Sequence, residues 1–133
     1  MKVLNLQEPW ASLVKEGCKR IETRSWRTNY RGELYIHASQ RKLTAREYDL
    51  YVEQLGLLRG TEFVYGAIIA KCRLVDCRLM TGELIAEVKK DRAEFLCGEY
   101  KPGRYAWILE DVEALEMPIP AKGQLGIWTF EQR

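Results

Sequence analysis

The sequence predicts an α+β fold in which short strands form a small mixed β-barrel and about three short helices interrupt them. Two observations support this fold class. Several short segments alternate apolar and polar residues, as strands do, and three segments repeat apolar residues at helical spacing. A chain of 133 residues is also long enough to bury a core without disulfides or a structural metal. We therefore expect residues 1–133 to form a single domain.

Strand patterns recur along the whole chain. Strands are predicted over residues 2–7, 19–26, 33–39, 63–79, 105–109 and 125–130, with a proline-bounded segment at 118–120. Alternation in the third strand places Leu34, Ile36 and Ala38 on the core face. His37 is then expected on the opposite face. The fourth strand is long enough to bend, and Gly66 is expected to mark a bulge or a close backbone approach.

The three predicted helices are recognised by their ends. Gly17 ends the first, because glycine tolerates the left-handed backbone that follows a helix. Thr44 begins the second, and Glu47 three residues later completes a capping box. Thr81 caps the third. The helices are expected from residue 9 to just before Gly17, from Thr44 to about residue 54, and from about residue 82 to 95.

Charge is nearly balanced overall but uneven along the chain. The 21 basic and 19 acidic residues give a formal net charge of +2, which is not the strongly basic balance of an indiscriminate DNA-binding protein. Between Lys15 and Arg31, six basic residues stand against two acidic ones, so this part carries the surface that attracts anions. Acidic residues gather later and are interpreted as solvated helix and loop faces. They are Glu83, Glu87, Asp91 and Glu94, then Glu110, Asp111, Glu113 and Glu116.

The sequence gives no reason to expect a membrane, a metal or a cofactor. Its longest apolar runs are far too short to cross a bilayer, and its N-terminus lacks the apolar stretch of a signal peptide, so a cytoplasmic protein is expected. The four cysteines form no Cys-x-x-Cys pair and accompany one histidine, which argues against zinc. We expect free thiols in the core. Cys18 differs from the others because the charges of Lys19 and Arg20 could stabilise its thiolate.

The most informative segment has the sequence GCKRIETR, from Gly17 to Arg24, at the junction of the first helix and the second strand. A strand needs no charge to form, so Lys19, Glu22 and Arg24 within six residues indicate a polar surface kept for a ligand. On a regular strand Glu22 and Arg24 share a face, and Lys19 can lean over it. The alternative is a surface ion-pair network of little energetic value.

The pattern Gly-x-Lys-x-x-Glu-x-Arg in this segment resembles the signature of the ASCH family, the activating-signal-cointegrator homology domains. Further strings match the family in the order that it shows them: LQEPWA at 6–11, YRG at 30–32 with IHAS at 36–39, and PGRYAW at 102–107. The resemblance therefore covers nearly the whole chain. It implies a PUA-like pseudobarrel with the helices packed on its outside.

The first functional hypothesis is a binding site for RNA or a nucleotide. Basic side chains would contact phosphates, and Trp26 or Tyr105 would stack on a base. Glu22 could accept a hydrogen bond from a base amino group while holding Lys19 and Arg24 in place. The expected ligand-binding residues are Lys19, Glu22, Arg24, Trp26, Arg27, Arg31, His37, Arg104, Tyr105 and Lys122.

The alternative hypothesis is a metal-independent hydrolase. Some bacterial proteins of the resembled family are amidohydrolases that remove the acetyl group of N4-acetylcytidine with a lysine, a threonine and a glutamate. Lys19 matches that lysine, but Glu22 stands at the threonine position, and Thr23 is one residue out of register on the opposite face of the strand. Ribonuclease activity is also known in the superfamily. The catalytic set would then be Lys19, Glu22 and Tyr105, with His37 as another candidate acid.

Several of these residues also have a structural interpretation. Trp10, Trp107 and Trp128 lie in apolar contexts that are typical of a core. Arg104 could pair with an acidic neighbour while Tyr105 packs, and a single histidine on a strand often has a structural hydrogen-bonding role. The residues alone do not distinguish binding from catalysis, a nucleoside from a polymer, or one oligomeric state from another. A protein-interaction domain is a third alternative.

Overall fold

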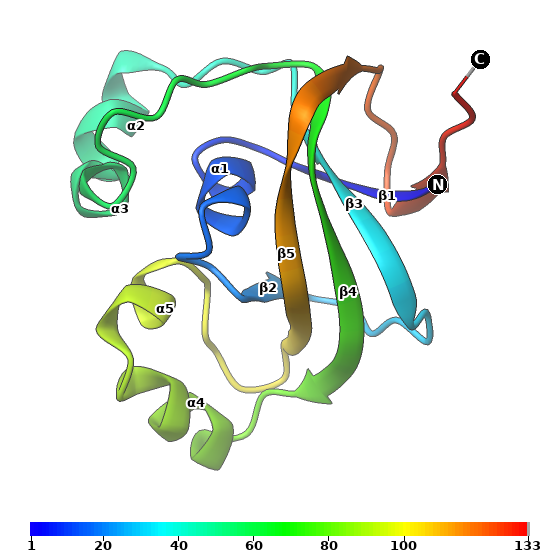
Figure 1. Cartoon of the computed structure of the whole chain (residues 1–133). Helices are drawn as coiled ribbons and strands as arrows, with labels where there is room; N and C mark the ends of the chain where they lie inside the picture. Colours follow the sequence, from blue (N-terminus) through cyan, green and yellow to red (C-terminus); the bar gives the residue numbers. More distant parts are fainter. Residues whose placement is uncertain (133) are drawn as a thin grey trace.

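A curled six-stranded sheet forms the body of the protein. The computed structural model describes residues 1–132. The strands are β1 (Lys2–Leu6), β2 (Ile21–Arg24), β3 (Gly32–Ala38), β4 (Ala67–Leu79), β5 (Tyr105–Pro120) and β6 (Ile127–Thr129). Their order is β2-β5-β4-β3-β1-β6, with β1 and β3 parallel and the other neighbours antiparallel. The sheet curves into a half-barrel (Figure 1), which confirms the predicted α+β class and the PUA-like pseudobarrel.

Irregular pairing accounts for the curvature of the two longest strands. Three register shifts interrupt the pairing of β4 with β5, and such bulges bend a strand and increase its twist. The predicted bend of the long strand is therefore confirmed. Gly66 lies just before β4 at a φ of +70°, and a Cβ there would lie 2.8 Å from Cγ of Gln40. Gly66 thus marks a close approach and not a bulge.

Five short helices are present among residues 1–132, because two of the three predicted helices are each divided. The helices are α1 (Trp10–Lys15), α2 (Ala45–Leu50), α3 (Val52–Gly56), α4 (Gly82–Lys89) and α5 (Arg92–Leu96). Tyr51 separates α2 from α3 with φ −102° and ψ 28°. Asp91 leaves the helical conformation to cap α5, as aspartate often does. The predicted capping box at Thr44 and the cap at Thr81 are confirmed.

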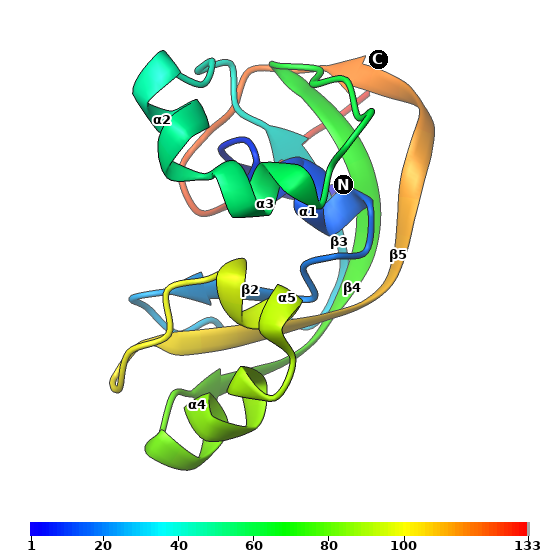
Figure 2. The ribbon, with the colours of Figure 1, turned by 90° about the vertical axis from the view of Figure 1, so that its left-hand side faces the viewer.

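Helix α1 lies inside the curve of the sheet and not outside it as expected (Figure 2). Its residues 11–14 are all buried, and Ala11 and Val14 belong to the same core cluster as Leu34, Ile36 and Trp107. An apolar helix that is buried on several sides can cover the open side of a half-barrel, where it packs on the core residues that further strands would cover in a closed barrel. The helix ends as predicted at Gly17, which has the left-handed φ of +81°.

The other four helices flank the start of β2. In Figure 2, α2 and α3 lie on one side of β2 and α4 lies on the other, while α5 lies level with β2. Helix α4 packs on the sheet through Leu84, whereas every side chain of α2 and α3 is at least partly exposed. The hydrogen bond from Nε2 of Gln54 to the carbonyl of Leu96 joins α3 to the end of α5 at 2.8 Å. Among residues 1–132, the helices are all too short or too polar to cross a membrane.

Candidate functional site

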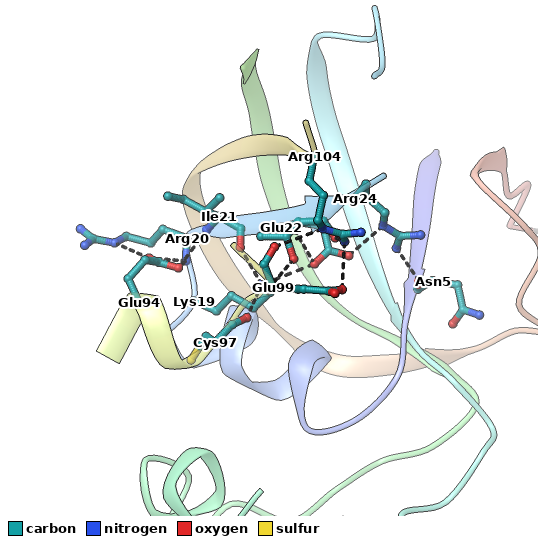
Figure 3. A network of polar contacts seen from close by, with 11 residues as sticks. Asn5, Lys19, Arg20, Ile21, Glu22, Arg24, Glu94, Cys97, Glu99 and Arg104 are labelled. Carbon is teal, nitrogen blue, oxygen red and sulfur yellow. Dashed lines mark hydrogen bonds and ion pairs between the residues drawn. The ribbon is translucent and has the colours of Figure 1, made fainter. Parts of the chain in front are cut away.

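A cleft of about 490 Å³ opens where α1, α3, β2 and the loop after α5 meet. It lies at the GCKRIETR segment, and its polar network is drawn in Figure 3. The lining residues are Trp10, Lys19, Glu22, Thr23, Arg24, Tyr51, Gln54, Leu96, Cys97, Gly98, Glu99 and Arg104. Four of the predicted site residues are therefore brought together along one cavity: Lys19, Glu22, Arg24 and Arg104.

Lys19 is buried at the floor of the cleft, with a relative exposure of 1%. The turn after α1 positions it, because its backbone N–H donates to the carbonyl of Leu13. Its Nζ donates to the carbonyls of Ile21 at 2.6 Å and Cys97 at 2.5 Å, and it lies 3.4 Å from Oε1 of Glu22. Two of the three hydrogens of the ammonium group are thus donated to carbonyls, and the Glu22 carboxylate pairs with its charge. Lys19 therefore connects β2 to the loop after α5 through its side-chain hydrogen bonds.

Glu22 links Lys19 to Arg24. Its carboxylate accepts hydrogen bonds from the backbone N–H of Thr23 at 3.1 Å and from Nε of Arg24 at 2.9 Å. Alternation along β2 points Glu22 and Arg24 to the same face, as predicted. Arg24 continues the network by donating from Nη2 to the carbonyl of Asn5 at 3.2 Å, and its guanidinium lies 5.8 Å from the centre of the Trp107 ring.

Arg104 adds a second guanidinium to the cleft. Its Nε donates to the carbonyl of Glu99 at 3.1 Å and its Nη2 to the carbonyl of Thr23 at 3.2 Å, while Nη2 also lies 3.5 Å from the Glu99 carboxylate. Arg104 therefore lines the cavity and pairs with an acidic neighbour. Three cationic and two anionic side chains line the cleft. Within residues 1–132, Nη1 of Arg24 and of Arg104 has no protein acceptor.

Buried Glu94 of α5 fixes the start of β2. Its two oxygens accept the backbone N–H of Arg20 at 2.9 and 3.1 Å, and one of them accepts that of Ile21 at 3.2 Å. The sequence interpretation of Glu94 as part of a solvated acidic face is wrong, because its relative exposure is 3%. Burial of this carboxylate is offset by the backbone donors that it accepts.

The aromatic wall of the cleft consists of Trp10 and Tyr51, whose ring centres are 5.0 Å apart at an interplanar angle of 69°. The two rings predicted to stack on a base lie elsewhere. Trp26 is 40% exposed but stands outside the lining, edge to face with buried Trp107. Tyr105 packs against the main core cluster. Tertiary packing brings Trp10 and Tyr51 together from positions 41 residues apart, which no local pattern shows.

Three other predicted binding residues lie on the surface beyond the cleft lining. They are Arg27, Arg31 and Lys122. Arg27 donates to the side chain of Asn29 at 3.2 Å, and Arg31 donates to the carbonyl of Tyr30 at 2.8 Å. The structure therefore does not group these cations with the charged residues of the cleft.

His37 is fully buried on the far side of the sheet from the main core, beneath the segment after β5. Its Nδ1 lies 2.8 Å from Oδ1 of Asn5 and its Nε2 lies 2.6 Å from the carbonyl of Ala121. A Cβ on Gly123 would lie 3.1 Å from the imidazole ring, so this glycine allows the segment to pass closely. These contacts fit the structural hydrogen-bonding role that a single histidine on a strand often has. His37 is outside the cleft lining.

Sequence reasoning missed Tyr51, Gln54, Gly98 and Glu99 as lining residues. Gly98 has a clear physical role, because a Cβ there would lie 2.8 Å from Cγ2 of Thr23. A glycine at this point lets the loop after α5 pass directly beside β2. The turn-forming composition of residues 98–103 was the one local signal of this loop.

The cysteines are free thiols, as expected. Burial raises the pKa of Cys97 to about 11 and that of Cys72 to about 12. The pKa of Cys18 is also raised, first by burial and then by the negative charges of Glu16 and Glu94. The expectation that neighbouring cations stabilise the Cys18 thiolate is therefore wrong. Among residues 1–132, no group of three or more His, Cys, Asp or Glu side chains is placed to hold a metal ion.

The domain is thus a small curled mixed sheet with a charged cleft, and comparison with known proteins identifies its family. Residues 4–119 match the model of the ASCH domain, so the chain belongs to the ASCH domain family. It is similar to activating signal cointegrator 1 of Homo sapiens, with 28% identity, and of Mus musculus, with 26% identity. Each match covers 98% of this chain but 22% of the relative. The chain thus spans about a fifth of the length of these curated relatives.

Proposed function

We propose that this chain binds RNA or a nucleotide in the cleft. The observation that supports this most strongly is that one cleft is lined both by the guanidinium groups of Arg24 and Arg104 and by the rings of Trp10 and Tyr51. Nucleotides combine an anionic phosphate with a flat base, and such pairs of surfaces recognise the two parts separately.

The electrostatics of the cleft favour an anion. Lys19 and Arg24 share the single carboxylate of Glu22, at 3.4 and 2.9 Å, and Glu99 offsets part of the charge of Arg104, so the three cations and two anions of the lining leave a net charge of +1. The contacts of Arg24 with Glu22 and Asn5 orient its guanidinium group. Nη1 of Arg24 and Nη1 of Arg104 are available to a phosphate. A cavity of about 490 Å³ is in the usual range for small ligands, so one nucleotide, free or within RNA, is the unit bound.

The same contacts favour binding over the hydrolase alternative. A catalytic lysine needs a free amine, whereas the amine of Lys19 donates to the carbonyls of Ile21 and Cys97 and is paired with the Glu22 carboxylate. Both oxygens of Glu22 are also engaged, with Thr23 and Arg24. Thr23 lines the cleft, which the alternation of the strand did not lead us to expect, but its Oγ1 accepts a hydrogen bond from the backbone N–H of Glu99 at 3.1 Å, and this bond disfavours its use as a nucleophile.

Fluorescence anisotropy with a labelled single-stranded RNA and with AMP as competitor tests the proposal. Arg104→Gln should weaken RNA binding about tenfold. It should also make the plot of log affinity against log salt less steep, by about one unit of slope, because one phosphate contact is lost. Arg59→Gln removes the same charge from an exposed position outside the cleft and serves as the matched control. Equal affinities for the two variants would refute a phosphate role for Arg104.

Stacking is tested separately with Tyr51→Leu, which keeps an apolar side chain and removes the ring. We expect a loss of about tenfold in affinity, since stacking on one ring contributes roughly 1–3 kcal/mol per base. Incubation with N4-acetylcytidine and with RNA in chelator reports on chemistry. If the natural chain forms cytidine or shortened RNA and the Glu22→Gln variant does not, the hydrolase alternative is correct and the binding proposal is refuted.

A further inference from the structure

Both acidic clusters of the sequence contribute carboxylates to an apolar groove that is separate from the cleft. The groove has a volume of about 330 Å³ and lies between α4, α5, β2 and β5. Ile21, Val88, Ile108 and Leu109 provide its apolar lining. Its lining carboxylates come from both clusters and are Glu87, Asp91, Glu94 and Glu110.

Among the residues that the structure describes, the groove and the cleft share no lining residue, although β2 contributes to both. Glu22 lines the cleft, whereas Ile21 lines the groove and packs with the cluster under α4. A second hollow of about 400 Å³ continues the groove along α4. It shares Ile21, Val88 and Ile108 with the first hollow and adds Glu83 to the rim.

The charge around this surface is opposite to that of the cleft. Five carboxylates and two guanidinium groups line the two hollows, for a net charge of −3. Of the two cations, Arg20 is already engaged with Asp91 at 3.0 Å and Glu94 at 3.4 Å. An anionic polymer would be repelled here, whereas cationic side chains would be attracted.

Within the described part of the chain, an unpaired edge of strand β5 also adjoins the groove. Strand β2 pairs with β5 only from Tyr105 to Ile108, and the last bond on that side runs from the N–H of Leu109 to the carbonyl of Arg20. Within residues 1–132, β4 is the only strand beside β5 from Glu110 onward. A polypeptide therefore has access to both an apolar surface and a strand edge at this place.

We propose that this groove binds a protein segment in which apolar side chains alternate with lysines or arginines. The apolar side chains of the segment cover Ile21, Val88 and Ile108, which are half-buried in the chain alone. Its cations lie against Glu87 and Glu110 at the rim, where exposed carboxylates add selectivity more than affinity.

The probe for this proposal is the labelled peptide KVKVKVK, measured by anisotropy and by backbone amide shifts of the isotope-labelled chain. The double variant Glu87→Lys with Glu110→Lys should weaken binding about tenfold, because each rim carboxylate contributes an attraction that becomes a repulsion. The matched control, Asp49→Lys with Glu62→Lys, changes net charge equally at exposed positions outside both hollows and away from β5, and should leave affinity within about twofold.

Two further peptides separate the apolar contribution from charge alone. KSKSKSK should bind at least about tenfold more weakly than KVKVKVK if the apolar floor is covered, and EVEVEVE should not bind. Amide shifts should map to Ile21, Val88 and Ile108, and Arg104→Gln should leave peptide affinity unchanged. Equal affinity for the serine and valine peptides, shifts confined to the cleft, or groove shifts produced by RNA or by self-association of the chain would overturn the proposal.

Discussion

At the scale of single residues, the buried charge of Lys19 is the feature on which the candidate site depends. A charged side chain with 1% exposure requires compensation, and three acceptors from β2 and the loop after α5 provide it. The ion pair with Glu22 is therefore a structural part of the domain as well as the floor of the cleft.

Lys19→Met should lower the free energy of unfolding by about 3 kcal/mol, because it removes the buried cation paired with Glu22 and the hydrogen bonds to the carbonyls of Ile21 and Cys97. Urea denaturation followed by tryptophan fluorescence measures this change. Lys15→Met is the comparison, since Lys15 forms only a more exposed pair with Glu16 and should alter stability by less than about 0.5 kcal/mol. Equal effects at the two positions would mean that the buried ion pair contributes nothing.

Glu8 is a second buried residue whose charge affects stability. Burial raises the pKa of its carboxyl above the ordinary 4.5, despite hydrogen bonds from the N–H and Oγ of Ser12 that act in the opposite direction. The folded state therefore holds the proton more tightly than the unfolded state. The resulting stabilisation is complete below the unfolded pKa and is lost as pH rises through the folded pKa.

Glu8→Gln keeps an oxygen to accept from Ser12 and removes the ionisation. We expect the urea midpoint of the variant, relative to the natural chain, to increase between pH 4 and pH 7.5. Glu16→Gln, at an exposed position, should show no such trend. A difference between Glu8→Gln and the natural chain that is constant over this pH range would contradict the assignment.

At the scale of elements, α5 holds the signature in place. This helix has only five residues, Arg92–Leu96, yet it contributes Glu94 to the backbone of β2, and the carbonyl of Cys97 just beyond it accepts from Lys19. Asp91 makes this possible by ending the preceding helix and capping the new one, so that the chain changes direction between α4 and α5.

Glu94→Ala should destabilise the fold by about 2 kcal/mol, because the N–H groups of Arg20 and Ile21 lose their acceptor. It should also weaken RNA binding at temperatures where the variant stays folded. Glu94→Gln retains one acceptor oxygen and should recover part of both properties. Denaturation midpoints and anisotropy on the three proteins provide the test, and unchanged stability of the alanine variant would show that water replaces the carboxylate.

At the scale of the whole molecule, the cleft is formed by parts of very different packing. Its α1 wall is buried in the curve of the sheet, whereas its α3 wall has side chains that are all at least partly exposed. The aromatic contact between Trp10 and Tyr51 and the hydrogen bond from Gln54 to Leu96 hold α3 in place. Opening of the domain is therefore expected to begin at α2 and α3.

Hydrogen exchange followed by mass spectrometry should show this difference. Amides of α2 and α3 should exchange at least about tenfold faster than those of α1, whose residues 11–14 are buried. Strands β3 and β4 at the middle of the sheet provide the slow reference. Similar protection of α1 and α3 would mean that the two walls open together.

Periodicity and capping residues predicted the elements that depend on local interactions. Thr44, Thr81 and Gly17 act where the sequence placed them, because a cap is made within one turn of its own helix. The division of the two longer helices was missed, since Tyr51 and Asp91 interrupt patterns that remain helical in composition. The extension of β5 to Pro120 was also missed, because its later residues are largely polar and pair with β4 on one side.

For this protein the sequence by itself determined the class of fold, the family, and the local arrangement of Glu22 and Arg24 on one face of β2. Those properties follow from spacing along the chain. Only the tertiary structure decided that Trp10 and Tyr51, and not Trp26 and Tyr105, border the cleft, and that Glu94 and Cys97 hold the signature. The physical reason is that these contacts join residues 41 to 78 positions apart, and packing of the helices around the curled sheet sets them.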